Sequence, residues 1–351
     1  VSLFDPLQNR QQTPAGGGRQ RQVFAHTYED IISVENLLAA WKEFRRGKRT
    51  KQDVLEFQTD LIYHISQLHE ELKTKTYKHG GYHHFRISDP KPRDIHKASV
   101  RDRLLHHALY RQLYPFFDNK FITDSYSCRV GKGMHKAMNR FRAFAYQVSK
   151  NHTRTCWALK CDIKKFFASI DHKLLYGILQ KHVTDRNILW LLREVVGSFP
   201  KGLPLGNLTS QLLVNIYMNE FDQYIKHNLK AKYYIRYADD FVLLSNNKQE
   251  LEQTLRYIEV FLQDKLKLKL HPDKVSINTL ASGIELLGWV HFPDHRVLRT
   301  MTKRRMMKRI AENSSAETIQ SYLGFLRHGN TEKLKWKIEG ETKKQFGAEV
   351  R

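Results

Sequence analysis

The sequence predicts an α+β protein in which amphipathic helices surround a few short apolar strands. Apolar residues recur at helical spacing near the N-terminus, as Val34, Leu37 and Trp41 do. By contrast, "CWALKCDI" (156–163) alternates with the two-residue period of a strand. "YYIRYADDFVLLS" (233–245) has two apolar runs around Ala238-Asp239, the form of a β-hairpin. With 41% hydrophobic residues in 351, the chain can build one large domain or two to three smaller ones.

The expected helices each carry an apolar stripe on one face. The first starts at Ser33 and includes Phe44, the second has its stripe from Val54 to Leu72, and the third runs from Val100 to near Pro115. Four more are expected: one capped by Asp171, two at 209–230 and 248–266, and the basic remainder from about 296.

Two further segments are predicted to be extended. "YHHFRISDPKPRDIH" (82–96) is typical of a strand or hairpin with a basic turn, and "GIELLGWVHF" (283–292) of a strand or tight hairpin. Residues 1–30 are polar, Gly-rich and basic, so we expect a flexible tail there.

Charge indicates a polyanionic partner. Lys and Arg total 59 against 36 Asp and Glu, a net charge of +23, which favours nucleic acid over an ordinary basic enzyme. The run "RVLRTMTKRRMMKR" contains no acid, and without i,i+4 acidic partners it is predicted to track phosphates rather than form a solvated helix face. Its candidate nucleic-acid-binding residues are Arg299, Lys303, Arg304 and Lys308.

Several classes are disfavoured by composition. The three cysteines lack CxxC spacing, which argues against a zinc ribbon or a disulfide framework and fits a reducing cytoplasm. The His doublets 83–84 and 106–107 lack metal-ligand spacing. No apolar run approaches the ~20 residues of a membrane span, and no signal-peptide core is present. We therefore expect a cytoplasmic protein without membrane contact.

Three carboxylates occur within predicted apolar strands, where burying a negative charge is costly in free energy. Asp239 and Asp240 adjoin within an apolar hairpin, and Asp162 closes another predicted strand. Buried like charges repel one another, so they need a counter-charge. Mg²⁺ prefers oxygen ligands, and two such ions ~3.5–4 Å apart can stabilise both oxygens of a phosphoryl transfer. A plain Asp-Asp turn is the alternative, which the β-branched and aromatic flanks weaken.

These blocks resemble those of reverse transcriptases, in the family's order. "YADD" is similar to the Tyr-x-Asp-Asp signature, and "KCDIKKFFASIDH" (160–172) to the first catalytic motif. The other similar blocks are "PKPRDIHKASVRDRLLHHAL" (90–109), "DSYSCRVGKGMHKAM" (124–138), "GLPLGNLTSQLLVNIYMNEFD" (202–222), "HPDKV" (271–275) and "ELLGWV" (285–290). The resemblance covers roughly residues 31–330 and implies a right-hand polymerase.

The resemblance also implies roles for single residues. Asp162, Asp239 and Asp240 would be catalytic and bind two Mg²⁺ ions, with Mn²⁺ as a substitute and the Ile163 carbonyl as a further ligand. Phe167 would be the steric gate against ribonucleotides, with core packing as the alternative role. The remaining nucleotide-binding candidates are Arg129, Arg93, Lys91, Leu205, Gln211 and Lys274, the last as a proton donor to pyrophosphate. Leu287 and Gly288 would form the primer grip.

The right-hand fold implies a domain layout and a mechanism. Fingers would occupy 31–160 with inserted palm-edge strands, an antiparallel-sheet palm 156–290, and a basic helical thumb 291–351. The primer 3′-hydroxyl would attack the α-phosphate of a deoxynucleotide triphosphate, and an RNA/cDNA duplex would be held by its backbone.

One departure from the common pattern indicates a subtype. "PLGNLTSQ" has Leu205 before Gly206 and Gln211 where proline is usual, which resembles reverse transcriptases of diversity-generating retroelements, relatives of group II intron and retron enzymes. "SYLGFLRHGNTEKL" (321–334) is similar to their thumb. That subtype is bacterial or phage-encoded. It implies a template RNA from the same element, cDNA synthesis that is error-prone opposite adenine, and a basic oligomeric accessory variability protein. A phage-defence or retron-type enzyme and a catalytically idle RNA-binding scaffold are the alternatives.

Overall fold

The computed structural model describes residues 23–88, 92–313 and 315–348. The chain divides into two compact units. The first comprises Val1–Cys128, Ile163–Lys232 and Tyr257–His271, and the second comprises Arg129–Asp162, Tyr233–Arg256 and Pro272–Arg351.

The first unit is mainly helical. Its elements are α1 (Tyr28–Ile32), α2 (Val34–Phe44), α3 (Gln52–Thr59), α4 (Leu61–Lys73), β1 (Tyr82–Ile87), β2 (Arg93–Ala98), α5 (Val100–Asp118), α7 (His172–Gln180), α8 (Arg186–Gly197) and α9 (Leu208–Gln223). A π-helical turn, Tyr224–Asn228, follows α9. Strands β1 and β2 form the predicted antiparallel hairpin.

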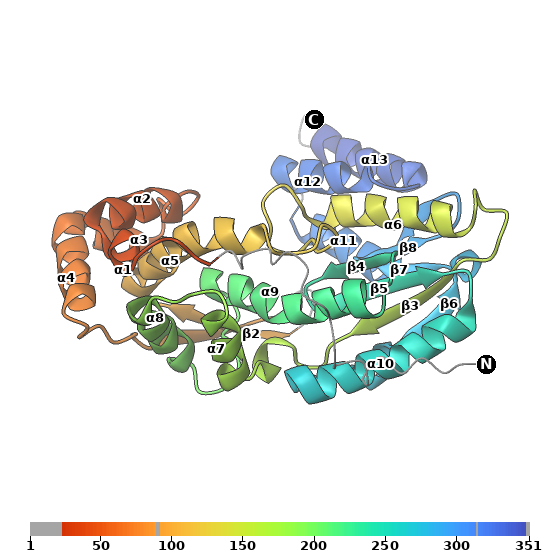
Figure 1. Cartoon of the computed structure of the whole chain (residues 1–351). Helices are drawn as coiled ribbons and strands as arrows, with labels where there is room; N and C mark the ends of the chain where they lie inside the picture. The colour runs from red at the N-terminus through yellow and green to blue at the C-terminus, as the bar shows by residue number, and fades with distance from the viewer. Residues whose placement is uncertain (1–22, 89–91, 314, 349–351) are drawn as a thin grey trace, which may run out of the picture. The chain divides into compact units, whose positions relative to one another are not determined.

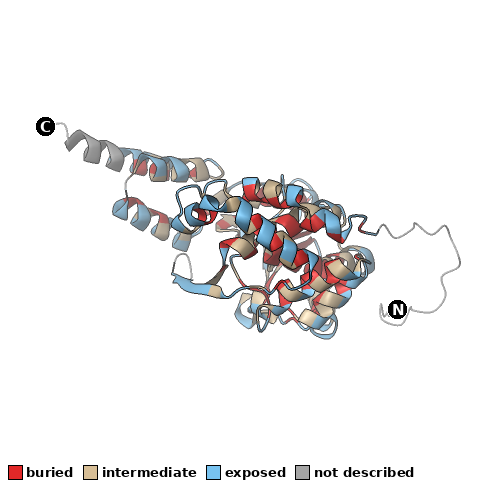
Figure 2. Cartoon of the chain, turned by 90° about the vertical axis from the view of Figure 1, so that its left-hand side faces the viewer, coloured by how far each residue is buried: buried red, intermediate tan, exposed pale blue. Residues whose placement is uncertain are grey.

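The helices of the first unit pack through their apolar faces. Leu37, Trp41 and Phe44 of α2 are buried, as the sequence predicted, and α2 packs against α5. The buried Asn36 amide also donates to the Ala108 carbonyl in α5 at 3.2 Å. Figure 2 shows this division, with buried residues on one side of each helix and exposed residues on the other.

The second unit contains two antiparallel sheets. Four strands lie in the order β4-β5-β3-β6, namely β4 (Tyr234–Tyr237), β5 (Asp240–Ser245), β3 (Trp157–Asp162) and β6 (Ser276–Thr279). Helix α6 (Met134–Val148) packs along β4 and β5 (Figure 1). Strands β7 (Ile284–Leu286), β8 (Trp289–His291) and β9 (Arg296–Leu298) form the second sheet.

The C-terminal helices pack around this smaller sheet. They are α11 (Thr300–Glu312), α12 (Ala316–Leu326) and α13 (Glu332–Ala348). Trp289 of β8 is fully buried in their apolar cluster together with Met138 of α6. A Cβ on Gly329 would lie 2.0 Å from the Trp289 ring, so only glycine fits there. Helix α10 (Lys248–Leu266) contains the boundary between the units.

The structure corrects the N-terminal expectation. Residues 1–22 of the expected tail lie outside the described residues, but 23–30 join the first unit. Phe24 is 5% exposed and its N–H donates to the His182 carbonyl at 2.9 Å, and α1 begins at Tyr28. Burial of the aromatic rings in this segment stabilises the folded state, whereas a flexible tail would leave those rings in water.

Two expected helix boundaries were wrong. The stripe from Val54 to Leu72 belongs to two helices, because Asp60 leaves the helical region (φ −114°, ψ 38°) between α3 and α4. Helix α5 also continues past Pro115 to Asp118. A proline within a helix removes one backbone hydrogen bond, which the surrounding packing tolerates here.

The C-terminal part differs from the prediction in its first element. Residues 296–298 were expected to be helical, but they form β9 and pair with β8, with Arg296 opposite His291. Helices α6 and α8 were not predicted. Each has a buried apolar stripe that could have been recognised, such as Met138, Phe141 and Ala145 in α6. No helix in the described ranges is long and apolar enough to cross a membrane.

Candidate functional site

The predicted hairpin places two carboxylates at its tip. Ala238 and Asp239 form a two-residue turn between β4 and β5, with Tyr237 paired to Asp240. Ala238 has φ +55°, the left-handed conformation that such tight turns require. The buried Arg236 guanidinium donates to the Ala238 carbonyl at 3.2 Å, which ties the turn to the strand below it.

The neighbouring strand brings the third carboxylate to the same place. Asp162 is the last residue of β3 and lies opposite Asp240 of β5. Asp162 is 9% exposed. Burial, with added repulsion from Asp162 and Asp240, raises the pKa of Asp239 to about 6. The second unit therefore gathers three mutually repelling carboxylates at one end of its four-stranded sheet.

Two lysines offset part of this negative charge. The Lys274 ammonium lies 2.7 Å from Asp162 Oδ1, and Lys160 Nζ lies 3.9 Å from Asp240 Oδ1. Lys274 reaches the site from the turn before β6, which pairs with β3 on the side away from β5.

The donor set fits a hard divalent cation. Carboxylate oxygens are the ligands that Mg²⁺ prefers, and a cation here would relieve the repulsion that raises the pKa of Asp239. Among the described residues, no three His, Cys, Asp or Glu side chains already stand at coordinating geometry. Lys274 holds one Asp162 oxygen, so binding of a cation would require that carboxylate to change partner.

Phe167 lies in the first unit beside a tight backbone contact. The Leu203 N–H donates to the Phe167 carbonyl at 2.8 Å, and a Cβ on Gly202 (φ +69°) would lie 2.3 Å from that oxygen. Phe166 is 4% exposed whereas Phe167 is half-buried. The core role thus falls to Phe166.

The Leu205 segment is fixed to the β1–β2 hairpin. The Leu205 carbonyl accepts from the His96 N–H at 3.1 Å, and the Asn207 amide donates to the His96 carbonyl at 3.0 Å. Arg93 lies at the start of β2 and is exposed. Gln211 is half-buried in the first turn of α9.

The remaining candidates are distributed over both units. Arg129 is half-buried before α6, and Ile163 forms an isolated bridge with Leu270. Leu287 (φ +52°) and Gly288 (φ +83°) form the two-residue turn between β7 and β8, as the tight-hairpin reading expected. Lys91 lies outside the described residues.

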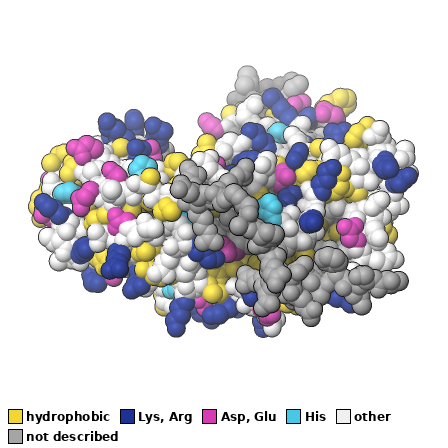
Figure 3. All heavy atoms as spheres, viewed as in Figure 1, with side chains coloured by type: hydrophobic (Ala, Val, Ile, Leu, Met, Phe, Trp, Pro, Cys, Tyr) yellow, Lys and Arg dark blue, Asp and Glu magenta, His cyan; other side chains and the backbone are white. Residues whose placement is uncertain are grey.

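The basic candidates lie on α11 or at its N-cap. Lys303, Arg304 and Lys308 are exposed. The expectation that these cations lack i,i+4 acidic partners was wrong for Lys308, which pairs with Glu312 at 3.6 Å. Arg299 pairs with Glu285, a residue distant in sequence, at 3.0 Å. Figure 3 shows Lys and Arg spread widely over the visible surface, as the net charge of +23 implies.

Sequence reasoning missed two side chains that support the carboxylates. The period of two in 156–163 places Lys160 on the same strand face as Asp162, but the proximity of its ammonium group to Asp240 was not predicted. Arg236 stands in an apolar run, where a buried guanidinium has no sequence signature.

Comparison with known proteins gives one family model and several relatives. The model of the family "Reverse transcriptase (RNA-dependent DNA polymerase)" matches residues 86–325. The protein YkfC of Escherichia coli is 27% identical over 294 residues, covering 72% of this chain and 73% of YkfC. The group II intron-encoded protein LtrA of Lactococcus lactis is 22% identical over 379 residues, covering 85% of this chain and 61% of LtrA.

Two further comparisons cover smaller shares of this chain and of the matched proteins. A putative COX1/OXI3 intron 2 protein of Saccharomyces cerevisiae is 20% identical over 299 residues, and the chain spans 34% of its length. The solved telomerase of Candida albicans, in complex with a telomeric RNA fragment, overlays with a TM-score of 0.48 at 10% identity, covering 66% of this chain and 48% of that chain.

The family match covers well over half of the chain, and it includes the hairpin that carries Asp239 and Asp240 as well as Asp162. The chain therefore belongs to the reverse transcriptase family and is an RNA-directed DNA polymerase.

Proposed function

We propose that this protein copies an RNA template into cDNA at the site formed by Asp162, Asp239 and Asp240. The observation that carries the proposal is the β3–β5 register, which sets Asp162 opposite Asp240 with Asp239 in the adjoining turn. Three carboxylates could hold the divalent cations that would stabilise the negative charge developing when a primer 3′-hydroxyl attacks an α-phosphate and pyrophosphate leaves.

Two Mg²⁺ ions, or Mn²⁺ in their place, are the proposed cofactor. When bound, they would supply the positive charge that stabilises the attacking and leaving oxygens. Asp162, Asp239, Asp240 and the Ile163 carbonyl would hold them. Lys274, which contacts Asp162 at 2.7 Å, would remain close enough to protonate the leaving pyrophosphate.

The proposed substrate contacts come from several elements. Phe167 would exclude the ribonucleotide 2′-hydroxyl, and Arg129 would hold the triphosphate with help from Arg93, because a guanidinium fork matches phosphate oxygens. Leu287 and Gly288 would grip the primer. Arg299, Lys303, Arg304 and Lys308 would follow the duplex backbone.

These roles correspond to a division into fingers, palm and thumb. We assign the fingers to 31–160, the palm to 156–290 and the thumb to 291–351. The four-stranded antiparallel sheet with α6 packed on it supports the palm assignment, and the helices α11 to α13 support the thumb assignment.

A direct assay tests the polymerase proposal. The purified chain should extend a DNA primer on an RNA template with deoxynucleotides when Mg²⁺ is present, and a chelator should stop extension. Ribonucleotide triphosphates serve as the matched substrate control. Absence of extension with folded protein, Mg²⁺ and Mn²⁺ would contradict the proposal.

Within the family, we propose the subtype found in diversity-generating retroelements. Its support is Leu205 and Gln211 in "PLGNLTSQ". Leucine offers only packing where glutamine could hydrogen-bond, so polar discrimination between bases should be weaker. The proposed template is an RNA of the same element, and the proposed partner is a basic, oligomeric accessory protein.

Fidelity at template adenine tests the role of Leu205. The backbone of Leu205 is held by His96, so Leu205→Gln changes the side chain while leaving that hydrogen bond in place. Misincorporation opposite adenine should fall in this variant and remain unchanged opposite the other three bases. Equal error rates in both proteins would refute the role of this position.

Sequencing the nucleic acid that co-purifies with the protein tests the subtype itself. An RNA containing a repeat whose second genomic copy differs mainly at adenines would support it. A structured RNA without such a repeat would favour the retron-type or phage-defence alternative.

A further inference from the structure

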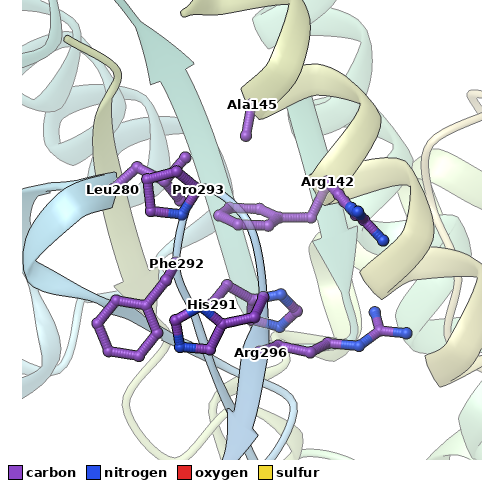
Figure 4. Close-up of a pocket in the computed structure, with 9 residues that line it drawn as sticks. Arg142, Ala145, Leu280, His291, Phe292, Pro293 and Arg296 are labelled. Atoms are coloured by element: carbon purple, nitrogen blue, oxygen red, sulfur yellow. The ribbon is translucent and has the colours of Figure 1, made fainter. Parts of the chain in front are cut away.

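A small pocket in the second unit lies between α6 and the turn that joins β8 to β9. It has a volume of about 30 Å³. Phe141 and Ala145 form its apolar side, while Arg142, His291 and Arg296 supply its polar groups (Figure 4). A water molecule needs roughly 10–15 Å³ on this measure, so the pocket has room for one or two oxygen atoms.

The two arginines of this pocket are not fully paired. Among the described residues, neither Arg142 nor Arg296 forms an ion pair. Arg296 donates through Nε to the His328 carbonyl and through Nη2 to Asn139 Oδ1 at 3.2 Å, but its buried Nη1 has no partner. Figure 4 shows the Arg142 and Arg296 side chains extending to the same side, one from α6 and one from β9.

A second polar atom among the pocket residues is also unsatisfied. His291 is 3% exposed, and its Nε2 has no hydrogen-bond partner. Burial and the neighbouring Arg296 lower the pKa of His291 to about 4, and burial together with Arg142 lowers the pKa of Arg296. Buried polar atoms without partners are costly, so a ligand oxygen that accepts a hydrogen bond from Arg296 would be favourable.

A wider groove continues from the pocket over the outer face of α6. It has a volume of about 640 Å³ and shares Arg142 and Pro293 with the pocket. Tyr146 and His152 line it, with ring centroids 5.3 Å apart, and Tyr146 is 47% exposed. Tyr146 is exposed and His152 is half-buried, and accessible rings next to cations are a combination on which nucleotide bases stack while their phosphates are neutralised. Asp294 is the acidic residue lining the groove.

We propose that this surface binds a nucleotide, with a phosphate oxygen in the pocket between Arg142 and Arg296 and the base against Tyr146 and His152. Guanidinium groups pair with phosphate oxygens through charge-assisted hydrogen bonds, and Arg296 Nη1 is a donor without a partner. The bound nucleotide is either one residue of a single-stranded RNA or a free nucleoside monophosphate. The site is separate from Asp162, Asp239 and Asp240, and it does not depend on the function proposed for them.

Photo-crosslinking tests the site and distinguishes the two sources. A single-stranded RNA oligomer containing 4-thiouridine is one probe, and 4-thiouridine monophosphate at millimolar concentration is the other. After irradiation of the full chain and digestion, mass spectrometry identifies the adducted peptide. We expect adducts on Tyr146 or His152.

Two exposed arginines provide a matched pair of variants. Arg142→Glu should reduce the adduct by about tenfold, the loss expected for one charge-assisted contact. Arg154→Glu makes the same charge change at an exposed residue outside the pocket and the groove, so it should leave the adduct within about twofold of wild type. Arg296→Lys keeps the charge but removes Nη1, and it should also weaken the adduct. Thermal melts confirm that each variant is folded.

Each outcome decides the proposal. Adducts from the RNA that decrease in Arg142→Glu support it with a strand as ligand, and adducts from the monophosphate alone support it with a free nucleotide. Adducts that are absent at Tyr146 and His152 with both probes, or that decrease equally in Arg142→Glu and Arg154→Glu, would overturn it.

Discussion

Asp162 and Asp240 lie directly opposite each other on the antiparallel strands β3 and β5, so the sheet register itself brings the two carboxylates together. Because side chains alternate between the faces of a strand, a register slip of one residue would separate them. The buried residues of both strands fix this register, and the apolar hairpin thereby determines the geometry of the charged site.

Asp239→Asn should stabilise the protein in the absence of divalent cations. Burial and the adjacent carboxylates raise the pKa of Asp239 to about 6, so the folded state holds its proton more tightly than the unfolded state does. Stability should therefore fall as pH rises from about 4 to about 6. Removing the charge should add about 1–3 kcal/mol at pH 7.5.

Urea denaturation in EDTA measures this effect. The two proteins should converge only below the ordinary Asp pKa of 3.8, where Asp239 becomes protonated in both the folded and the unfolded state. A variant that is less stable than wild type at pH 7.5 in EDTA would contradict the inferred repulsion.

Lys274→Met should have the opposite effect. The ammonium group contacts Asp162 at 2.7 Å, and its loss leaves that carboxylate beside two others without this partner. In EDTA we expect a loss of about 1–3 kcal/mol. Mg²⁺ should raise the melting temperature of the variant by more than that of wild type, because the cation no longer competes with Lys274 for Asp162. Equal Mg²⁺ shifts in both proteins would exclude such competition.

Phe167→Ala should reduce discrimination against ribonucleotides by about 10–100-fold without unfolding the protein. Phe166→Ala is the matched control. Phe166 is buried whereas Phe167 is half-buried, so the control should lose about 3–5 kcal/mol of stability instead. Single-nucleotide incorporation kinetics and thermal melts separate the two effects. Unchanged discrimination against ribonucleotides in Phe167→Ala would show that this ring is not the steric gate.

The double variant Lys303→Gln with Arg304→Gln should lower the salt dependence of RNA/DNA duplex binding. Each phosphate contact contributes about 0.9 to the slope of log K against log salt, so the slope should decrease by about 1–2. Lys308→Gln should lower the slope by less than one full contact, because Lys308 already pairs with Glu312. Equal slopes for the double variant and wild type would show that these residues of α11 do not contact the duplex.

Local sequence signals predicted the elements whose pattern is short and self-contained. The 233–245 hairpin, the Leu287-Gly288 turn and the Asp171 cap of α7 all follow from neighbouring residues, and the structure confirms them. The 248–266 helix is confirmed with the same bounds. In each case the apolar period or the turn chemistry is sufficient by itself.

Contacts between residues far apart in the sequence could not be predicted from local patterns. Lys274 contacts Asp162 across 112 positions, and no local pattern links them. Strands β6 and β9 are too short to show a period, and they exist because a neighbouring strand offers hydrogen bonds. The break at Asp60 likewise depends on how α3 and α4 pack, since the apolar stripe continues through it.

Asp162, Asp239 and Asp240 together should perform RNA-templated DNA synthesis. Extension of a DNA primer on an RNA template, measured for wild type and for Asp239→Asn combined with Asp240→Asn, tests it most directly. Asparagine keeps the shape of each side chain and removes its charge. We predict that the double variant folds, still binds the primer–template duplex and incorporates no deoxynucleotide above background. Full extension by the folded double variant would contradict the account.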